Sequence, residues 1–421
     1  MNRLLLDIGA SNIKSVVQTK GLINSNSLFL SQSFSTKFGD KFKAQVIIDE
    51  FKKHVIKQLK NYIFDEIWLC SEMHNIVLYN KITQTYSDFV SWRHVSDKSD
   101  EIKSHINKFR NYHALSGQTL HDGIPILNLT NLFEDEGEHQ ILTLPELITH
   151  KLGKSTLKIH STMAASTGML NVKNNCWLHD LMCNLYPNLK YALPEVFKEN
   201  ESPFLGEIKI NNKNLKVFGG FGDLQTALLG SNIEDNEICI NLGTGSQIIS
   251  TIREVENYSN MVDIKPFFGK YIKALTHIPA GRSLNFIQKY IYKNNDFWDI
   301  LQNTKMPATQ NIDVNFNLNI FKSNWRYSPK NKTKIRNYLK SNNNFFEAIL
   351  SAFCNEYIDA IRYLDYKNDS KYIYLSGGKL KDLKYVKEFF KNIKEYKLKE
   401  KKYKNKLDTT LLGLDILSNK F

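Results

Sequence analysis

The chain has 421 residues, of which 42% are hydrophobic and 24% are charged. This length allows two domains of about 200 residues, each with a sizeable core, and the composition excludes a disordered chain. The net charge of +13 is compatible with a polyanionic partner, but the lysines are spread along the chain without an arginine-rich arm, so we expect no nucleic acid and favour attraction of a small anion such as a nucleotide.

The sequence offers no signal for export or for a membrane. Its five cysteines are odd in number and lie mostly in apolar runs, which suits a reducing compartment. The apolar run at the N-terminus is too short for a signal peptide and contains Asp7, and no stretch approaches the ~18 apolar residues of a membrane span. We therefore expect a cytoplasmic protein without a membrane partner.

The first readable element is a β-hairpin. Arg3 to Ile8 is an apolar run, and Ile13 to Gln18 alternates well enough for a second strand. The turn between them offers carboxylate, backbone, side-chain and ammonium groups from Asp7, Gly9, Ser11, Asn12 and Lys14. Such a turn could hold the β- and γ-phosphates of a nucleotide and, through Asp7, a hydrated Mg²⁺; a plain hairpin explains the segment equally well.

A helix from Ala44 to Asn61 and a buried strand from Glu66 to Cys70 follow. Polar residues come directly after this strand, where open α/β sheets place ligands. Among them, His74 could hydrogen-bond a hydroxylated substrate, although a structural histidine is an alternative. Further on, the ring of Trp92 could form one wall of a binding site and the guanidinium of Arg93 could supply hydrogen-bond donors to it. Alternatively, both residues simply cap the core.

The middle of the chain is less informative. The residues from Ile141 to Leu152 have the spacing of an amphipathic helix, and 156–170 is rich in small hydroxyl residues that could line a polar cleft. Cys176, His179 and Cys183 have zinc-like identities. They would lie on one helix without a second ligand pair, so a half-buried helix explains them better than a metal.

The glycine-rich stretch from Gly219 to Ser250 is the most informative part of the sequence. It reads as a turn that places Asp223 at the start of a helix, then a strand from Ile238 to Leu242, then a tight turn from Gly243 to Ser246. A carboxylate near a nest of backbone N–H groups suggests phosphoryl transfer with Asp223 as the base. A buried helix cap and an ordinary hairpin are the alternative.

Glycines also follow a strand near the C-terminus. The pair Gly377-Gly378 comes after a strand from Tyr372 to Leu375 and would let an adenine ring lie on the backbone; an ordinary turn is the alternative. The other elements expected here are a strand at 271–278, a helix at 284–292, short strands and loops at 294–344, a long amphipathic helix at 345–364, a basic helix within 381–406 and a final helix at 408–419.

Taken in order, these motifs resemble the FGGY carbohydrate kinases. The resemblance covers nearly the whole chain, from Asp7 to Gly378. It implies an α/β fold with two actin-like (ribonuclease H-like) lobes and a cleft between them. The lobe 1–230 would bind the sugar and carry the catalytic base, and the lobe 231–421 would bind the nucleotide.

The resemblance assigns roles to the N-terminal motifs residue by residue. Asp7 looks like the family's hairpin acid, associated with Mg²⁺ and the γ-phosphate, and Gly9, Ser11, Asn12 and Lys14 match the part that contacts phosphate. Met73 and His74 resemble the pair that xylulose, gluconate and related kinases use at the sugar. Trp92 and Arg93 resemble a Trp-Gln-Asp or Trp-Arg-Asp element, with His94 where an acid is often found.

The resemblance also assigns roles to the motifs in the second half of the chain. Asp223 matches the catalytic base, Gly243-Thr244-Gly245 the second phosphate loop, and Gly377-Gly378 the adenosine loop. Gln225, in Asp-Leu-Gln, and the later Asn-Leu-Gly-Thr-Gly-Ser-Gln look more like the sedoheptulose kinase branch than like typical xylulose kinases.

The resemblance therefore implies a kinase that uses ATP and Mg²⁺ and takes a small-molecule sugar, with a sedoheptulose-like or a xylulose- or ribulose-like ketose as the acceptor. Three alternatives stay open: a kinase for a polyol or a sugar acid, a non-catalytic ATP-binding sensor or assembly protein of the actin-like type, and a nucleic-acid-binding protein that uses the lysine-rich C-terminal third. A homodimer is also left open.

Overall fold

The computed structural model describes most of the chain in ten ranges: 2–9, 12–18, 41–132, 137–198, 200–243, 245–256, 258–306, 342–367, 369–401 and 407–421. Ser11, Thr244 and the stretch 307–341 lie outside these ranges. The chain divides into two compact units. Unit 1 comprises Met1–Asn232, Lys265–Gly269 and Tyr403–Phe421, and unit 2 comprises Ile233–Ile264 and Lys270–Lys402.

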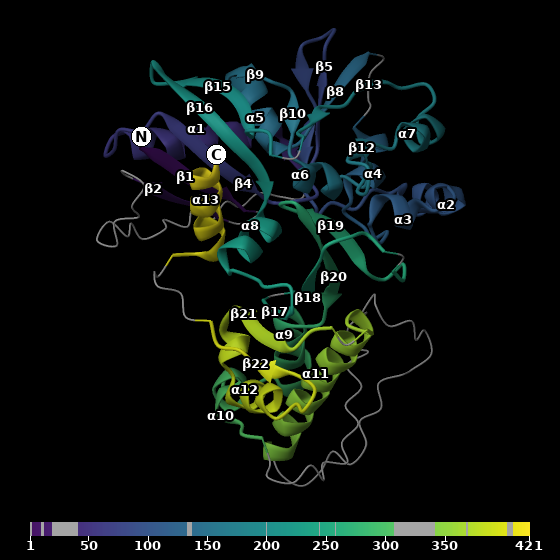
Figure 1. The fold of residues 1–421 in the computed structure, drawn as a ribbon, viewed down its shortest axis with the longest axis vertical. Helices are drawn as coiled ribbons and strands as arrows, with labels where there is room; N and C mark the ends of the chain where they lie inside the picture. The colour runs from purple at the N-terminus through teal and green to yellow at the C-terminus, as the bar shows by residue number, and fades with distance from the viewer. Residues whose placement is uncertain are drawn as a thin grey trace. The chain divides into compact units, whose positions relative to one another are not determined.

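A six-stranded sheet forms the centre of unit 1 (Figure 1). Its strands lie in the order β2 (Ile13–Gln18), β1 (Arg3–Ile8), β4 (Glu66–Ser71), β16 (Lys213–Gly222), β15 (Phe204–Ile210) and β9 (Gly153–Ser155). The strands β1, β4 and β16 run parallel, and the register pairs both Ile8 and Gly222 with Ser71. Since β4 is buried on both faces, it reads as a continuous apolar run.

Alternate residues of β1 face two different cores, as the period of a strand requires. Leu4 and Leu6 belong to a core with α1 (Ala44–Leu59) and α5 (Leu144–Leu152). Leu5 belongs to the core on the other face, which includes apolar side chains of α13 (Thr409–Lys420). The C-terminal helix is therefore an integral part of unit 1.

Smaller elements complete unit 1. A second sheet has the order β13 (Lys190–Ala192), β8 (Glu138–Leu142), β5 (Val77–Asn80) and β6 (Thr85–Tyr86). The two-stranded sheets pair β3 (Lys41–Lys43) with β7 (Asp88–Val90), β10 (Lys158–Ile159) with β14 (Glu195–Val196), and β11 (Leu170–Asn171) with β12 (Cys176–Trp177). The remaining helices are α2 (Ser99–Lys108), α3 (Tyr112–Ser116), α4 (Pro125–Asn128), η2 (Leu129–Asn131), α6 (Ser161–Ser166), α7 (His179–Leu185) and α8 (Asp223–Gly230).

Unit 2 is built on the other six-stranded sheet, of which only the end of β19, from Lys265, belongs to unit 1. Its order is β19 (Asp263–Phe267), β20 (Lys270–Ile278), β18 (Ser246–Ile252), β17 (Glu237–Leu242), β21 (Tyr372–Gly377) and β22 (Lys397–Leu398). The helices are α9 (Gly281–Phe286), the π-helix η3 (Ile287–Tyr292), α10 (Phe297–Asn303), α11 (Asn342–Leu364), η5 (Lys379–Asp382) and α12 (Lys384–Lys391).

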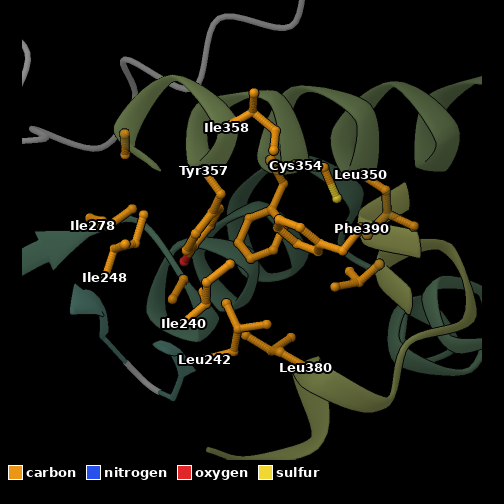
Figure 2. Close-up of a cluster of buried hydrophobic side chains, with 14 of the residues drawn as sticks. Ile240, Leu242, Ile248, Ile278, Leu350, Cys354, Tyr357, Ile358, Leu380 and Phe390 are labelled. Carbon is orange, nitrogen blue, oxygen red and sulfur yellow. The ribbon is translucent and has the colours of Figure 1, made fainter. Parts of the chain in front are cut away.

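The long helix α11 supplies the main apolar face of unit 2. Figure 2 shows Leu350, Cys354 and Tyr357 of α11 in one cluster with Ile240 and Ile248 of the sheet. The helical residues recur at the three- and four-residue spacing of one helix face. The long amphipathic helix expected from the sequence is thus confirmed.

Several expected elements differ in their bounds. The expected helix 141–152 begins only at Leu144, because Thr143 and Glu146 form a capping box there and Ile141 still belongs to β8. The expected turn at Gly219 to Gly222 is the end of β16, where a bulge opposite β4 interrupts the register between Gly219 and Phe221.

In the described part of 381–406, which ends at 401, the expected basic helix is the shorter α12, and the segment 176–183 is a short strand followed by α7. None of the helices in the described ranges is long and apolar enough to cross a membrane.

Candidate active site

The carboxyl ends of the three parallel strands of unit 1 place the sequence-predicted groups at one edge of the sheet. Asp7 is the penultimate residue of β1, and Met73 follows shortly after the end of β4. Asp223 comes directly after β16, as the first residue of α8. Because Ile8 and Gly222 are both paired with Ser71, these groups are neighbours although they are far apart in sequence. Ligands commonly bind at such an edge in α/β sheets.

Asp7 lies in a network of charged and polar groups. Its side chain faces Lys14, the residue opposite it in the hairpin, with 3.5 Å between Nζ and Oδ2. The hydroxyl of Thr410 donates to the same Oδ2 at 2.9 Å, and the Cys70 thiol lies 3.5 Å from Oδ1. Lys14 also donates to Oδ2 of Asp408 at 2.9 Å. Burial raises the pKa of the Asp7 carboxyl, against the opposing effects of Lys14 and Thr410.

The carboxyl of Asp223 has a raised pKa. Burial raises the pKa of its carboxyl to about 7, the charge of Asp7 acts in the same direction, and the ammonium groups of Lys14 and Lys265 act against it. Its Oδ1 accepts a 2.8 Å hydrogen bond from the N–H of Leu224, which orients the carboxylate. A carboxyl with a pKa near neutrality can accept a proton in its working pH range.

The residue before the candidate base is held in place from a neighbouring helix. The N–H of Gly222 donates to Oγ1 of Thr162 at 3.0 Å, and that hydroxyl lies 2.8 Å from Nδ1 of the half-buried His160. A Cβ at Gly222 would lie 2.7 Å from Oε1 of Gln225 and 3.0 Å from Sδ of Met73. Glycine at the strand end therefore leaves room for these two side chains next to Asp223.

Gln225 is an unusual feature of this edge. Its side chain is fully buried beside Gly222, one turn into α8. Within the part of the chain that the structure describes, neither its amide nitrogen nor its amide oxygen has a hydrogen-bond partner. Burial of an unpaired amide is unfavourable, so a group that both donates and accepts, such as a hydroxyl, would complement it.

His74 is fixed by contacts with α6. Its backbone has a positive φ of 57°, its N–H donates to Oγ of Ser166 at 3.2 Å, and its Nδ1 lies 2.6 Å from the Ser166 carbonyl oxygen. Since a carbonyl can only accept, Nδ1 carries the proton, and in the neutral ring Nε2 is then the acceptor nitrogen. The ring also meets His121 edge-on, with 5.6 Å between centroids.

Trp92 and Arg93 are linked to the same edge through Glu72. Burial raises the pKa of the Glu72 carboxyl to about 7, while the charge of Arg93 and the hydrogen bonds from Ser91 and Trp92 oppose that effect. The Arg93 guanidinium lies 5.8 Å from the centre of the Trp92 ring. The Trp92 side chain is 38% exposed, so it is not a core residue.

In unit 2, the two glycine motifs lie side by side. The strands β17 and β21 are parallel, and the register pairs Asn241 with Ser376 and Leu242 with Gly377. The N–H of Gly378 donates to the carbonyl of Leu242 at 2.9 Å. The loop after β17 and the loop after β21 therefore emerge from adjacent strand ends, as expected for two parts of one ligand site.

The loop after β21 is held by a steric requirement for glycine, and the loop after β17 is held by backbone hydrogen bonds. Gly377 has a φ of +98°, and a Cβ there would lie 2.6 Å from Oδ1 of Asn241. Gly243 donates to the carbonyl of Gly245 at 3.1 Å, and its own carbonyl accepts from the N–H of Gly281 at 3.1 Å. This second bond ties the loop to the start of α9.

The sequence-predicted residues are thus distributed over two groups. Unit 1 holds Asp7, Gly9, Asn12, Lys14, Met73, His74, Trp92, Arg93, Asp223 and Gln225, and unit 2 holds Gly243, Gly245, Gly377 and Gly378. The remaining two, Ser11 and Thr244, lie outside the described residues.

Sequence reasoning gave no role to four residues of unit 1: Glu72, which it placed only among the polar residues after β4, and Lys265, Asp408 and Thr410. The only signal for the last two was an Asp-Thr-Thr run before an apolar helix, which is the pattern of any helix cap. Lys265 is 3% exposed, and a buried lysine is rare.

Two metals were considered from the sequence, zinc at Cys176, His179 and Cys183 and Mg²⁺ at Asp7. Among the described residues, no group of three or more His, Cys, Asp or Glu side chains is arranged to hold an ion. Cys176 and Cys183 are exposed, free thiols on β12 and α7. Mg²⁺ is usually bound by one or two carboxylates together with substrate phosphates, so a single site such as Asp7 does not need a larger cluster.

Comparison with known proteins establishes the fold. No protein-family model matches the chain, and a search of curated proteins gives no match. Gluconate kinase from Lactobacillus acidophilus is similar in structure, with a TM-score of 0.79 and 19% identity over 99% of this chain and 88% of that chain. The ligand-bound xylulose kinase from Lactobacillus acidophilus has a TM-score of 0.78 and 19% identity over 99% of this chain and 89% of that chain.

Plasmodium falciparum glycerol kinase with ADP is also similar, with a TM-score of 0.76 and 16% identity over 99% of this chain and 88% of that chain. The chain therefore has the α/β fold of the FGGY carbohydrate kinases, with actin-like units, as the sequence resemblance implies.

Proposed function

We propose that the protein is an ATP-dependent carbohydrate kinase that transfers the γ-phosphoryl group to a hydroxyl of a sugar. The observation that carries the proposal is Asp223. This carboxylate has a pKa of about 7 and lies at the same sheet edge as the Asp7–Lys14 hairpin and the Met73–His74 pair. Base, phosphate hairpin and candidate sugar ligands thus occur together in one unit.

Asp223 would act late in the transfer. A sugar hydroxyl has an aqueous pKa far above 7, so a carboxylate cannot ionise it in advance. Asp223 instead accepts a hydrogen bond from the hydroxyl, which orients the attacking oxygen, and takes the proton as that oxygen bonds to phosphorus. Its backbone bond to Leu224 keeps the accepting oxygen in place.

The hairpin of unit 1 fits the phosphates and Mg²⁺. Carboxylate oxygens are the ligands that Mg²⁺ prefers, and Asp7 would hold the ion; the bound ion would neutralise charge that develops on the phosphoryl oxygens. Lys14 supplies a further positive charge beside Asp7. In the described part of the turn the N–H of Gly9 donates to the carbonyl of Asn12 at 2.9 Å, so we assign the contact with phosphate oxygens to the side chains of Asn12 and Lys14.

Unit 2 carries the two glycine loops that the sequence resemblance assigns to the nucleotide. Gly243 and Gly245 are two positions without side chains that would allow close approach of a phosphate, and Gly377 and Gly378 would allow the same for adenosine. One of the structures with this fold, the Plasmodium falciparum glycerol kinase, contains ADP, which supports a nucleotide for this chain as well.

For the acceptor we favour a ketose, sedoheptulose-like or xylulose- or ribulose-like. The unpaired Gln225 amide can donate to one hydroxyl and accept from another. A sugar acid is the second candidate, because the buried ammonium of Lys265 acts on Asp223 and would also pair with a carboxylate.

The test is a coupled ADP-release assay with MgATP and a panel of ketoses, aldoses, polyols and sugar acids. We expect one or a few members to stimulate ADP release strongly, and Asp223→Asn to abolish that stimulation while binding of MgADP is retained. If every sugar leaves ADP release at its background rate while nucleotide binds, the protein is a non-catalytic nucleotide-binding member of the fold. Equal turnover by Asp223→Asn would refute the role of the base.

A further inference from the structure

The N-terminus of α13 closes a ring of contacts around Asp7. Asp408 caps the helix, since its Oδ1 accepts from the N–H of Thr410 at 3.0 Å. Its Oδ2 accepts from Lys14 at 2.9 Å, and Lys14 in turn lies 3.5 Å from Asp7. The Thr410 hydroxyl contacts Oδ2 of Asp7 at 2.9 Å and also Oδ1 of Asp408. We call Asp7, Lys14, Asp408 and Thr410 the Asp7 ring.

The ring is held rigidly because α13 packs very closely on α8. A Cβ at Gly230 would lie 1.9 Å from the carbonyl oxygen of Thr409, and a Cβ at Gly413 would lie 2.0 Å from the carbonyl oxygen of Thr226. Two glycines therefore allow the backbones of the two helices to touch. Since α8 begins at Asp223, this contact fixes the start of α13 against the helix that carries the candidate base.

Two residues at the start of α13, Asp408 and Thr410, supply partners for the charged side chains of Lys14 and Asp7. Asp7 and Thr410 are both buried, and the ring contains two carboxylates but only one ammonium. Without Asp408, the Lys14 side chain would have only Asp7 as a partner in the ring. Without the hydroxyl of Thr410, the Asp7 carboxylate would lose a charge-assisted hydrogen bond and could turn towards Lys14.

We propose that Asp408 and Thr410 are positioning residues for nucleotide binding: Thr410 orients the Asp7 carboxylate and Asp408 directs the Lys14 ammonium. The C-terminal helix is then a working part of the phosphate site and not only a closing element of the fold. This inference rests on the proposed function, because it concerns the same nucleotide phosphates and Mg²⁺.

The test is calorimetric titration of the full-length protein with MgADP, together with KM values for MgATP and for the sugar. We expect Thr410→Val to weaken MgADP binding by about tenfold and to raise the KM for MgATP, because a bond to a charged group is lost, while the KM for the sugar changes little. Thr410→Ser keeps the hydroxyl and should bind within about twofold of wild type. Asp408→Asn should weaken MgADP binding by about threefold or more.

Asp415→Asn is the matched control. Asp415 lies on the same helix and its Oδ1 accepts from Gln18 of β2 at 2.5 Å, so this variant also removes a carboxylate that joins α13 to β2. It should lower Tm about as much as Asp408→Asn but leave MgADP binding within about twofold.

Equal MgADP binding by wild type, Thr410→Val and Asp408→Asn would overturn the inference while leaving the kinase proposal intact. Loss of binding in Thr410→Ser equal to that in Thr410→Val would also overturn it, because the hydroxyl would then be irrelevant. If wild type neither binds MgADP nor releases ADP with any sugar, the proposed function fails and the inference falls with it.

Discussion

The glycine pair after β21 allows a sharp prediction, since two adjacent glycines differ in what they require. Gly377 has a φ of +98°, and a Cβ there would lie 2.6 Å from Oδ1 of Asn241 and 2.7 Å from the carbonyl oxygen of Leu242. Gly378 has a φ of −82°, and its Cβ would be at an ordinary 3.7 Å from the same carbonyl. Alanine should therefore be excluded at Gly377 and tolerated at Gly378.

The cost at Gly377 has two parts. A left-handed backbone costs an alanine about 1–2 kcal/mol, and forcing a methyl group into packed backbone costs about 1–3 kcal/mol. We expect Gly377→Ala to lower the free energy of unfolding by about 2–5 kcal/mol. Because the paired ends of β17 and β21 must separate, we also expect MgADP binding to weaken by at least about tenfold.

Urea unfolding and calorimetry with MgADP measure both effects. Gly378→Ala is the control for stability, and it should change the free energy of unfolding by no more than about 1 kcal/mol, in the stabilising direction if at all. If Gly377→Ala matched Gly378→Ala in the free energy of unfolding, the strand register and the close approach of Gly377 to Asn241 would be wrong.

Three further predictions concern titrating groups. Because the pKa of Asp223 is about 7 and the ionised form is the base, kcat/KM should fall about tenfold per pH unit below pH 7, and a rate independent of pH between 5 and 8 would contradict this. Lys265 lowers the pKa of Asp223, so Lys265→Met should move this acid limb to higher pH, whereas Lys270→Met, which removes a partner of Asp235, should not; a limb that stayed in place in both variants would count against Lys265 as a neighbour of the base. Burial lowers the pKa of His54 from its usual 6.5 to about 4, so the unfolded state binds more protons and the free energy of unfolding should fall as the pH drops from about 6.5 to 4. In His54→Gln, urea unfolding should show this pH slope reduced by up to about 1.4 kcal/mol per pH unit, and an unchanged slope would mean that His54 is not buried as a neutral ring.

The sequence revealed the parts of the site that end a strand. Asp7, Met73 and Asp223 each follow or end an apolar run, and the carboxyl ends of such runs meet at one edge when the strands are parallel. The glycine loops after β17 and β21 could be predicted for the same reason. The order of these motifs, rather than any one of them, indicated the fold that the solved structures confirm.

The contacts made by α13 could not be predicted in this way. Thr410 touches Asp7 across 403 residues of sequence, and the cap pattern of Asp408 is the same at helices with no role in a site. Lys265 looks like any other lysine of a basic chain until its burial is known. Glycine is equally ambiguous, because both a bulged strand end and a free turn favour it. The glycines before Asp223 lie in a bulged strand end.

The most direct test of the central claim is the fate of the γ-phosphoryl group. ³¹P NMR of the protein with MgATP and the most stimulating sugar should show a sugar phosphomonoester that grows in step with ADP. The signal should be absent in Asp223→Asn. Formation of only ADP and inorganic phosphate, or an unchanged ATP spectrum with every sugar of the panel, would contradict phosphoryl transfer to a sugar.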